Sequence, residues 1–317
     1  MLAKWWMWVL GAASALPAFG QDVALLGGRT QVQGDGATFG FTFAYSHDIA
    51  RNLAAGFSYV NEGHVPGHHR DGVAAQLWLQ GEATPGLQLG VAAGPYQYFD
   101  TTLAESADGF HDAHGTGVLY SAAATWRLRR SPVFLRARLD RVEAYGTPDS
   151  TQFLVGVGYR LDQDGSSVEN SNGLAWRRQN DQEVVAYAGQ TVVNSFESES
   201  NAAYAVEYRH ALGPVARVSA MWMKEGDARL IRRDGVIAQG WLEPSFSDDR
   251  WTMGLGLGAY FAVDRYREEP RHVSPLVATT LSYNLSRRWT ARLNWYRVIS
   301  NYDRDSDVFL AGVGYRF

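Results

Sequence analysis

The sequence contains one unit twice, and this duplication restricts the possible folds more than any other feature. The segment Arg70–Leu79 (RDGVAAQLWL) recurs as Arg233–Leu242 (RDGVIAQGWL), and Phe153–Arg160 recurs as Phe309–Arg316. An internal repeat of this length sets the number of structural units that the fold contains. The chain therefore divides into a first copy, a linker and a second copy, at residues 21–162, 163–182 and 183–317.

The first twenty residues predict a secretory signal peptide. Lys4 supplies a positive charge, residues 5–16 form an apolar core, and Ala18-Phe19-Gly20 is a small-x-small cleavage site. The apolar run is too short for a membrane anchor. We therefore expect cleavage before Gln21 and export of the remaining chain.

The composition excludes several classes of function. The chain has no cysteine, which removes disulfide scaffolds and thiol catalysis. Its net charge of -4 carries no nucleic-acid signature. We therefore expect no nucleic-acid partner, and we expect no cofactor.

Hydrophobic residues alternate with small or polar ones along both copies. In Trp251–Gly258 and Phe309–Phe317, one face carries large apolar groups and the other carries mainly glycine, alanine, threonine or arginine. A soluble sandwich would instead bury the apolar face and place charges on the other. Alternating segments of about ten residues between turn signals are typical of transmembrane barrels. Eight such segments occur in each copy, joined alternately by short turns and longer polar loops.

The last segment ends Tyr315-Arg316-Phe317 and resembles the closing strand of bacterial outer-membrane β-barrels. In that class the terminal aromatic residue is recognised by the barrel assembly machinery. The resemblance implies an all-β, antiparallel transmembrane barrel in the bacterial outer membrane. Its partners would be outer-membrane lipid, lipopolysaccharide and the assembly machinery.

The two copies can close one barrel of about sixteen strands or two tandem barrels of eight. Only the second copy ends in phenylalanine, which favours a single barrel. Small inward positions also favour it, because the interior of an eight-stranded barrel is filled by side chains and glycines would leave voids. These positions include Gly156, Gly158, Gly254, Gly256 and Gly312. We therefore predict one barrel, with the linker 163–182 in the periplasm as a possible contact for a partner there.

Charged and polar residues that alternate with apolar ones are predicted to face the lumen. A charge facing lipid near the membrane midplane costs about 2–4 kcal/mol, so the opposite orientation is favoured. Such residues either form a network that stiffens the wall or select an anionic or saccharide solute. The predicted lumen residues are Arg136, Arg138, Asp140, Arg292, Asn294, Tyr296, Gln76, Trp78, Gln239, Trp241, Glu62 and Glu225.

Histidines gather in the loop that follows Glu62. His64 or His68, together with Glu62, is a candidate for general acid–base catalysis. His64, His68 and His69 are candidates for metal ligands. In the second copy Asp227 occupies the position equivalent to His64, and the other two histidines have no counterpart. This favours a structural role, with no catalytic or metal site.

The function predicted from these patterns is an outer-membrane channel for passive diffusion or export of a hydrophilic solute, with a saccharide or an anion as the candidate solute. One alternative is an enzyme that modifies lipid A or phospholipid through a His/Glu site at the extracellular rim. Another is a structural or receptor barrel that does not conduct. The oligomeric state is left open.

Overall fold

The computed structural model describes residues 20–104, 109–129, 131–161, 182–213, 215–227, 230–246, 250–265 and 271–317. The predicted signal peptide up to residue 19 and linker residues 163–181 lie outside the described residues, so both stay predictions. Among the described residues no helix is long and apolar enough to cross a membrane.

The described elements are strands. The first copy forms β1 (Gln21–Val32), β2 (Gly36–Ala50), β3 (Leu53–Val65), β4 (His68–Thr84), β5 (Leu87–Leu103), β6 (Phe110–Arg127), β7 (Val133–Ala144) and β8 (Ser150–Arg160). The second copy forms β9 (Gln182–Val193), β10 (Ser200–Ala211), β11 (Ala216–Lys224), β12 (Arg233–Leu242), β13 (Ser245–Phe246), β14 (Trp251–Asp264), β15 (Arg271–Asn284), β16 (Trp289–Val298) and β17 (Ser306–Arg316).

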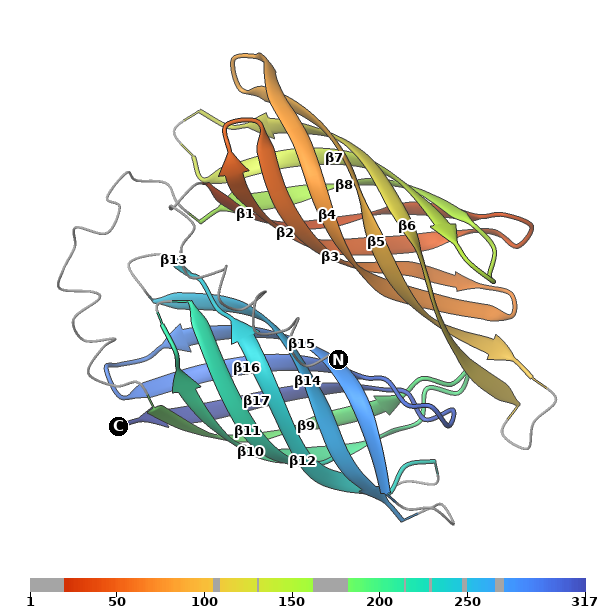
Figure 1. Cartoon of the computed structure of the whole chain (residues 1–317), viewed down its shortest axis with the longest axis vertical. Helices are drawn as coiled ribbons and strands as arrows, with labels where there is room; N and C mark the ends of the chain where they lie inside the picture. Colours follow the sequence, from red (N-terminus) through yellow and green to blue (C-terminus); the bar gives the residue numbers. More distant parts are fainter. Residues whose placement is uncertain are drawn as a thin grey trace, which may run out of the picture. The chain divides into compact units, whose positions relative to one another are not determined.

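The first copy closes into a barrel of its own, which we call the first barrel. Each strand from β1 to β8 runs antiparallel to the next (Figure 1). β1 then pairs with β8 over its whole length, from Asp22 opposite Arg160 to Val32 opposite Ser150. Every strand therefore has two hydrogen-bonded neighbours, as backbone groups in lipid require.

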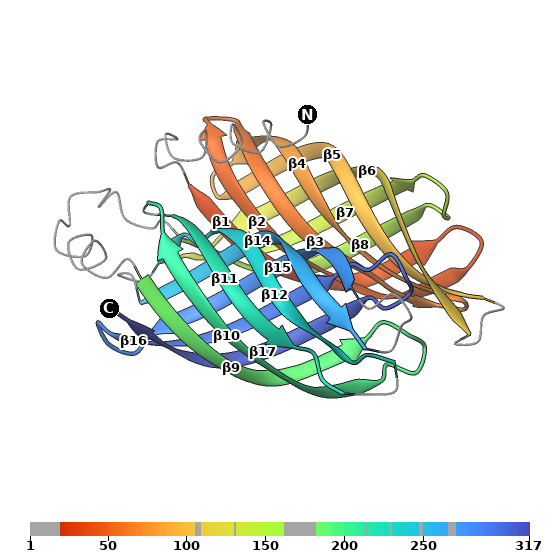
Figure 2. The same cartoon turned by 60° about the horizontal axis from the view of Figure 1, so that its bottom comes forward.

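The second copy also closes on itself and forms the second barrel (Figure 2). β9 pairs with β17, with Glu183 opposite Arg316. β12 pairs with β14, and the two-residue strand β13 lies against the beginning of β14. The first strands, β1 and β9, begin at the end of each barrel that we call the "turn end". They finish at the opposite end, which we call the "loop end".

The prediction of an all-β antiparallel barrel fold with eight main strands in each copy is confirmed. The expectation that both copies close one sixteen-stranded barrel is wrong, and the alternative of two tandem barrels is correct. The reason is that β1 pairs with β8 and not with β17. The predicted units 21–162 and 183–317 therefore correspond to complete barrels, Gln21–Arg160 and Gln182–Arg316.

The inward glycines do not have the effect expected from the sequence. A Cβ atom on Gly256 would lie 2.7 Å from Cε3 of Trp241, and a Cβ atom on Gly312 would overlap the ring of Tyr187. These glycines make room for aromatic side chains from neighbouring strands. They are part of a filled interior and do not indicate a wide lumen.

The two faces of each wall differ in the way that a membrane requires. In β7, Arg136, Arg138 and Asp140 are buried, whereas Leu135 and Leu139 are 47% and 50% exposed. Large apolar side chains are exposed over both barrels. They include Leu25, Leu77, Leu89, Val91, Trp126, Phe153 and Val157 in the first and Val184, Tyr204, Trp222, Val236, Leu257, Phe261, Leu293, Phe309 and Val313 in the second.

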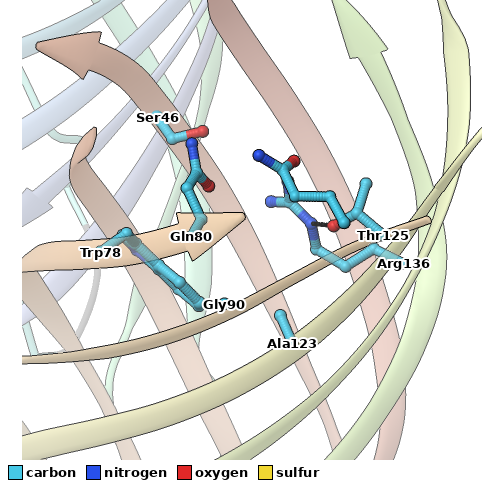
Figure 3. A pocket seen from close by; sticks show the side chains of 8 residues that line it. Ser46, Trp78, Gln80, Gly90, Ala123, Thr125 and Arg136 are labelled. Atoms are coloured by element: carbon cyan, nitrogen blue, oxygen red, sulfur yellow. Dashed lines mark hydrogen bonds between the residues drawn. The ribbon is translucent and has the colours of Figure 1, made fainter. Parts of the chain in front are cut away.

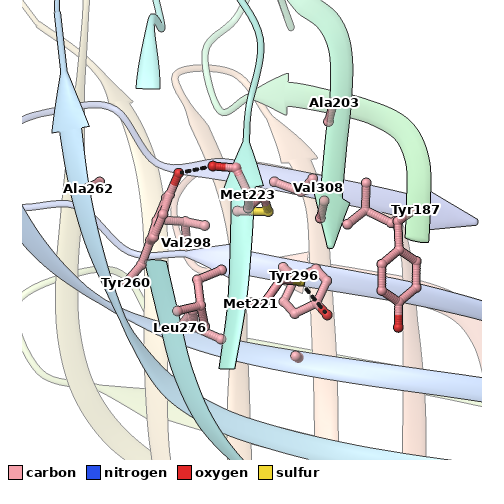
Figure 4. Close-up of a cluster of buried hydrophobic side chains, with 14 of the residues drawn as sticks. Tyr187, Ala203, Met221, Met223, Tyr260, Ala262, Leu276, Tyr296, Val298 and Val308 are labelled. Carbon is pink, nitrogen blue, oxygen red and sulfur yellow. Dashed lines mark hydrogen bonds between the residues drawn. The ribbon is translucent and has the colours of Figure 1, made fainter. Parts of the chain in front are cut away.

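The interior of the second barrel combines its polar residues with a cluster of buried apolar side chains (Figure 4). Met221 and Met223 of β11 pack there with Tyr260 and Tyr296. The Tyr260 hydroxyl donates to the carbonyl of Met223 at 3.2 Å, and the Tyr296 hydroxyl contacts Sδ of Met221 at 3.7 Å. Polar and apolar contacts together therefore close this part of the interior.

Candidate functional site

The twelve predicted lumen residues all lie inside a barrel, and each is 9% exposed or less. The alternation rule therefore assigned their direction correctly. The structure places them in two separate interiors, because each copy closes by itself. A role in solute binding stays a prediction.

At the loop end of the first barrel, Glu62 and Arg70 form a buried bidentate ion pair. Arg70 Nε donates to Glu62 Oε1 at 2.9 Å, and Nη2 donates to Oε2 at 2.6 Å. Tyr96 donates to Glu62 Oε1 at 2.7 Å, and the Ser150 hydroxyl also donates to this carboxylate. Arg70 Nη1 reaches the carbonyl of Pro148 at 2.6 Å. The carboxylate therefore links β3, β4, β5 and β8 across the interior.

The second barrel repeats this arrangement with equivalent residues. Arg233 Nε and Nη2 donate to Glu225 Oε1 and Oε2 at 2.6 and 2.8 Å. Ser306 donates to Glu225 Oε2 at 2.5 Å, and Arg233 Nη1 reaches the carbonyl of Arg304 at 3.2 Å. We call the residues Glu62, Arg70 and Ser150, and their counterparts Glu225, Arg233 and Ser306, the loop-end clusters.

Each loop-end cluster is extended by a hydroxyl that connects the arginine to a second carboxylate. In the first barrel, Thr147 accepts from Arg70 at 3.3 Å and donates to Asp100 at 2.9 Å. In the second barrel, Tyr302 accepts from Arg233 at 2.9 Å and donates to Asp264 at 3.2 Å. Burial raises the pKa of the Tyr302 hydroxyl to about 12.

The middle of the first barrel is crossed by a second network centred on Arg138. Its Nε donates to Asp140 Oδ1 at 2.7 Å, and its two Nη atoms donate to Ser58 and Gln76 at 3.2 and 3.1 Å. Ser121 donates to the same Asp140 oxygen at 2.5 Å. These contacts join four strands, and Arg138 is only 1% exposed.

The turn end of the second barrel contains a dense set of alternating charges. Arg209 donates to both oxygens of Glu207 at 2.9 Å and to Glu243. Arg292 lies 2.7 Å from Glu183 Oε2 and 3.5 Å from Glu243 Oε1. All five side chains are fully or almost fully buried, and each arginine contacts two carboxylates.

The turn end of the first barrel has looser contacts. Asp22 is the carboxylate nearest to three arginines, with Arg127, Arg160 and Arg136 at 3.5, 3.6 and 3.7 Å. Arg136 Nε also donates to Thr125 at 2.9 Å. A small cavity of about 10 Å³ lies beside Arg136 (Figure 3). It is lined by Ser46, Trp78, Gln80, Gln88, Gly90, Ala123, Thr125 and Arg136.

The three candidate histidines do not meet at one site, because His64 and His69 lie together and His68 lies apart from them. Gly63, with φ of 82°, lies in a β-bulge between Asn61 and His64, which breaks the regular alternation. His64 is consequently exposed, and its ring lies beside that of His69 at an interplanar angle of 35°, with centroids 3.6 Å apart. His68 instead lies 3.0 Å from Asp100, next to the loop-end cluster. The described residues hold no group of three or more His, Cys, Asp or Glu side chains arranged for a metal ion.

Three buried charges of the second barrel, Glu183, Glu207 and Arg209, were not identified from the sequence. Glu207 and Arg209 alternate with exposed Val206 and Tyr208 in β10. The rule that directs charges away from lipid would have placed both of them inside. Their pairing with Glu243 and Arg292 depends on cross-barrel geometry that no local pattern contains.

No protein-family model matches the sequence, and no curated protein sequence matches it. The N-terminal β-barrel domain of Pseudomonas aeruginosa OprF is similar in structure, with 17% identity, a TM-score of 0.36, and coverage of 45% of this chain and 99% of that domain. Ail, the attachment invasion locus protein of Yersinia pestis, solved with the heparin analogue sucrose octasulfate, has 16% identity, a TM-score of 0.33, and coverage of 44% and 98%.

The Ralstonia pickettii toluene transporter TbuX is also similar, with 10% identity and a TM-score of 0.26, and the match covers 96% of this chain and 92% of TbuX. The class assignment rests on the closed walls described above, with apolar exteriors and polar interiors. The chain is a bacterial outer-membrane β-barrel protein, and its localisation is the outer membrane. It differs from a wide single barrel by having two eight-stranded barrels.

Proposed function

We propose that the protein is a pair of non-conducting outer-membrane barrels with a structural or receptor role, exercised at the loop end. The observation that carries this proposal is the loop-end cluster, present in both barrels with the same residue types. Each cluster combines a buried ion pair within one wall with a serine hydrogen bond from a strand on the other side of the interior. An eight-stranded barrel is narrow enough for such side chains to fill it.

The energetics support a closed interior. Removing one partner from a buried ion pair costs about 3–5 kcal/mol, because the other charge is left uncompensated. A solute that crosses the first barrel would have to displace the contacts that span its interior. These are the hydrogen bond from Ser150 of β8 to Glu62 of β3 and those from Arg138 of β7 to Ser58 and Gln76 of β3 and β4. The residues that make these contacts are all buried. Spontaneous opening wide enough for a saccharide is therefore strongly disfavoured.

Planar-bilayer recording of the purified full chain tests this proposal. We expect no stepwise conductance, and insertion is verified separately by protease protection and by the altered gel migration of folded barrels. A porin of known conductance, reconstituted in parallel, controls for the recording. Sustained channel steps from verified, inserted protein would overturn the non-conducting function.

Transport of a hydrophilic solute is the second candidate function. It is favoured by the unfilled cavity and the cluster of arginines at the turn end of the first barrel. Liposome swelling separates the two candidates. Transport predicts faster swelling in an isotonic pentose or disaccharide than in protein-free liposomes, whereas closed barrels predict equal rates.

A further inference from the structure

The two barrels provide a direct comparison at one arginine. Arg136 is the fourth residue of β7 and lies opposite Gly156, and Arg292 is the fourth residue of β16 and lies opposite Gly312. The two side chains therefore enter their interiors at equivalent positions near the turn end. Both are at least nine-tenths buried.

The surroundings of the two arginines differ in charge and in filling. Glu183 contacts Arg292 at 2.7 Å, whereas its counterpart Asp22, shorter by one methylene, stays 3.7 Å from Arg136. Arg209 fills the second interior, and its counterpart Ser46 leaves that space open. The strand registers establish this equivalence. Ser46 precedes His47, which pairs with the first residue of β1. Arg209 precedes His210, which pairs with the first residue of β9.

A third difference removes a charge from the first barrel. Glu243, two residues after Trp241, lies 3.5 Å from Arg292. Gln80, two residues after Trp78, stands in its place and is neutral, and its amide donates to Asp48 at 2.7 Å. The cavity beside Arg136 is therefore where the second barrel holds an arginine and a carboxylate.

Arg136 has no hydrogen-bonded counter-charge in the described part of the chain: Asp22 forms a loose ion pair with it, and the other carboxylate that acts on it, Asp48, accepts instead from Gln80. The one hydrogen bond of Arg136 there is from Nε to Thr125, and 3.7 Å to Asp22 exceeds hydrogen-bond length. Asp22 is also shared with Arg127 and Arg160. A buried guanidinium with a shared and distant carboxylate is electrostatically undercompensated. The cavity beside it consequently favours a negatively charged occupant.

We propose that this cavity binds one small inorganic anion of about chloride size on the Arg136 guanidinium. A volume of about 10 Å³ is close to the least that holds a single water-sized particle, which excludes sugars and organic acids. Donors from Arg136 face it, and the Gln80 and Gln88 side chains line it. The second barrel has no such site at Arg292, because Glu183 and Glu243 already neutralise that arginine. The proposal requires no conduction through the barrel.

Chloride-35 NMR of the purified full chain in micelles tests the proposal in solution. We expect a saturable excess linewidth that added bromide displaces. The variants Gln80→Glu and Asp22→Glu each install the residue of the second barrel, and each should remove the saturable part. Arg29→Gln, which deletes an exposed arginine outside the cavity, is the matched control and should retain it. Gel migration confirms that each variant is folded.

Crystals soaked in bromide locate the site by anomalous scattering. The proposal predicts a peak beside Arg136 and none beside Arg292, which serves as an internal control in the same crystal. Three results would each overturn the proposal. These are the absence of a saturable chloride signal, its retention in both folded variants, and equal bromide peaks at both arginines. A bromide peak without the solution signal would mean an adventitious ion only, and would equally overturn it.

Discussion

The two barrels are nearly the same at the loop end and different at the turn end. Glu62–Arg70 and Glu225–Arg233 have the same bidentate geometry, with a serine donating to each glutamate. At the turn end, Arg209 and Glu243 of the second barrel are replaced by a serine and a glutamine in the first. The same eight-stranded fold can therefore close around different interior residues at one end while it keeps the same buried ion pair at the other.

The largest effect is expected from Arg209→Met in the second barrel. This change leaves Glu207 and Glu243 buried without their shared partner, at a cost of about 3–5 kcal/mol of unfolding free energy. Urea unfolding of protein refolded into vesicles measures it. Arg136→Met in the first barrel is the comparison and should cost less, since its carboxylate is more distant. Equal losses would refute the difference between the turn ends.

A slightly smaller effect, about 3 kcal/mol, is expected from breaking either loop-end cluster. Arg70→Met and Arg233→Met should destabilise their own barrels to a similar extent, because the ion pairs match in geometry and burial. Adding Glu62→Gln to Arg70→Met should restore part of the loss by neutralising the unpaired group. The same unfolding assay applies, and a clearly unequal cost in the two barrels would show that the clusters are not equivalent.

A glycine substitution tests whether the interiors are filled. Gly256→Ala should cost about 1–3 kcal/mol through overpacking against Trp241. Gly240→Ala is the matched control in the neighbouring strand, because nothing lies within 4 Å of the added carbon. If both variants unfold at the wild-type urea concentration, the second interior has more space than the structure shows.

The smallest effect concerns alkaline pH. Burial raises the pKa of Tyr302 from 10.0 to about 12. As the pH rises, the unfolded chain therefore loses this proton before the folded chain does. The contribution of Tyr302 to the free energy of unfolding is complete below pH 10 and is lost as the pH rises through about 12. Unfolding profiles of wild type and Tyr302→Phe should diverge in this window. Thr147 takes this place in the first barrel, and Thr147→Val should show no such divergence.

Much of the fold could be predicted from alternation, because inward and outward residues differ locally along each strand. Arg138 and Leu139, for example, were assigned to opposite faces correctly. The number of barrels could not be predicted this way. β1 presents the same pattern whether it pairs with β8 or β17, and only the observed register separates the two closures.

The sequence predicted which side chains of the candidate site face the interior, but not which of them contact one another. Glu62 was placed inside from the sequence, yet its contact with Arg70 depends on the β3–β4 register and on the bulge at Gly63. The same bulge separates His64 from Glu62. A regular alternation would have kept both on one face. Sequence spacing alone therefore does not show which histidines share a face with Glu62.

Independent closure also affects how the chain can reach its folded state. The pairing of Asp22 with Arg160 completes the first wall without any residue from the second copy. A single barrel would have required β1 to wait for β17, across most of the chain, and loop-closure entropy grows with that separation. Each half can thus acquire its full set of strand pairings on its own, and a substitution that delays one wall leaves the pairings of the other intact.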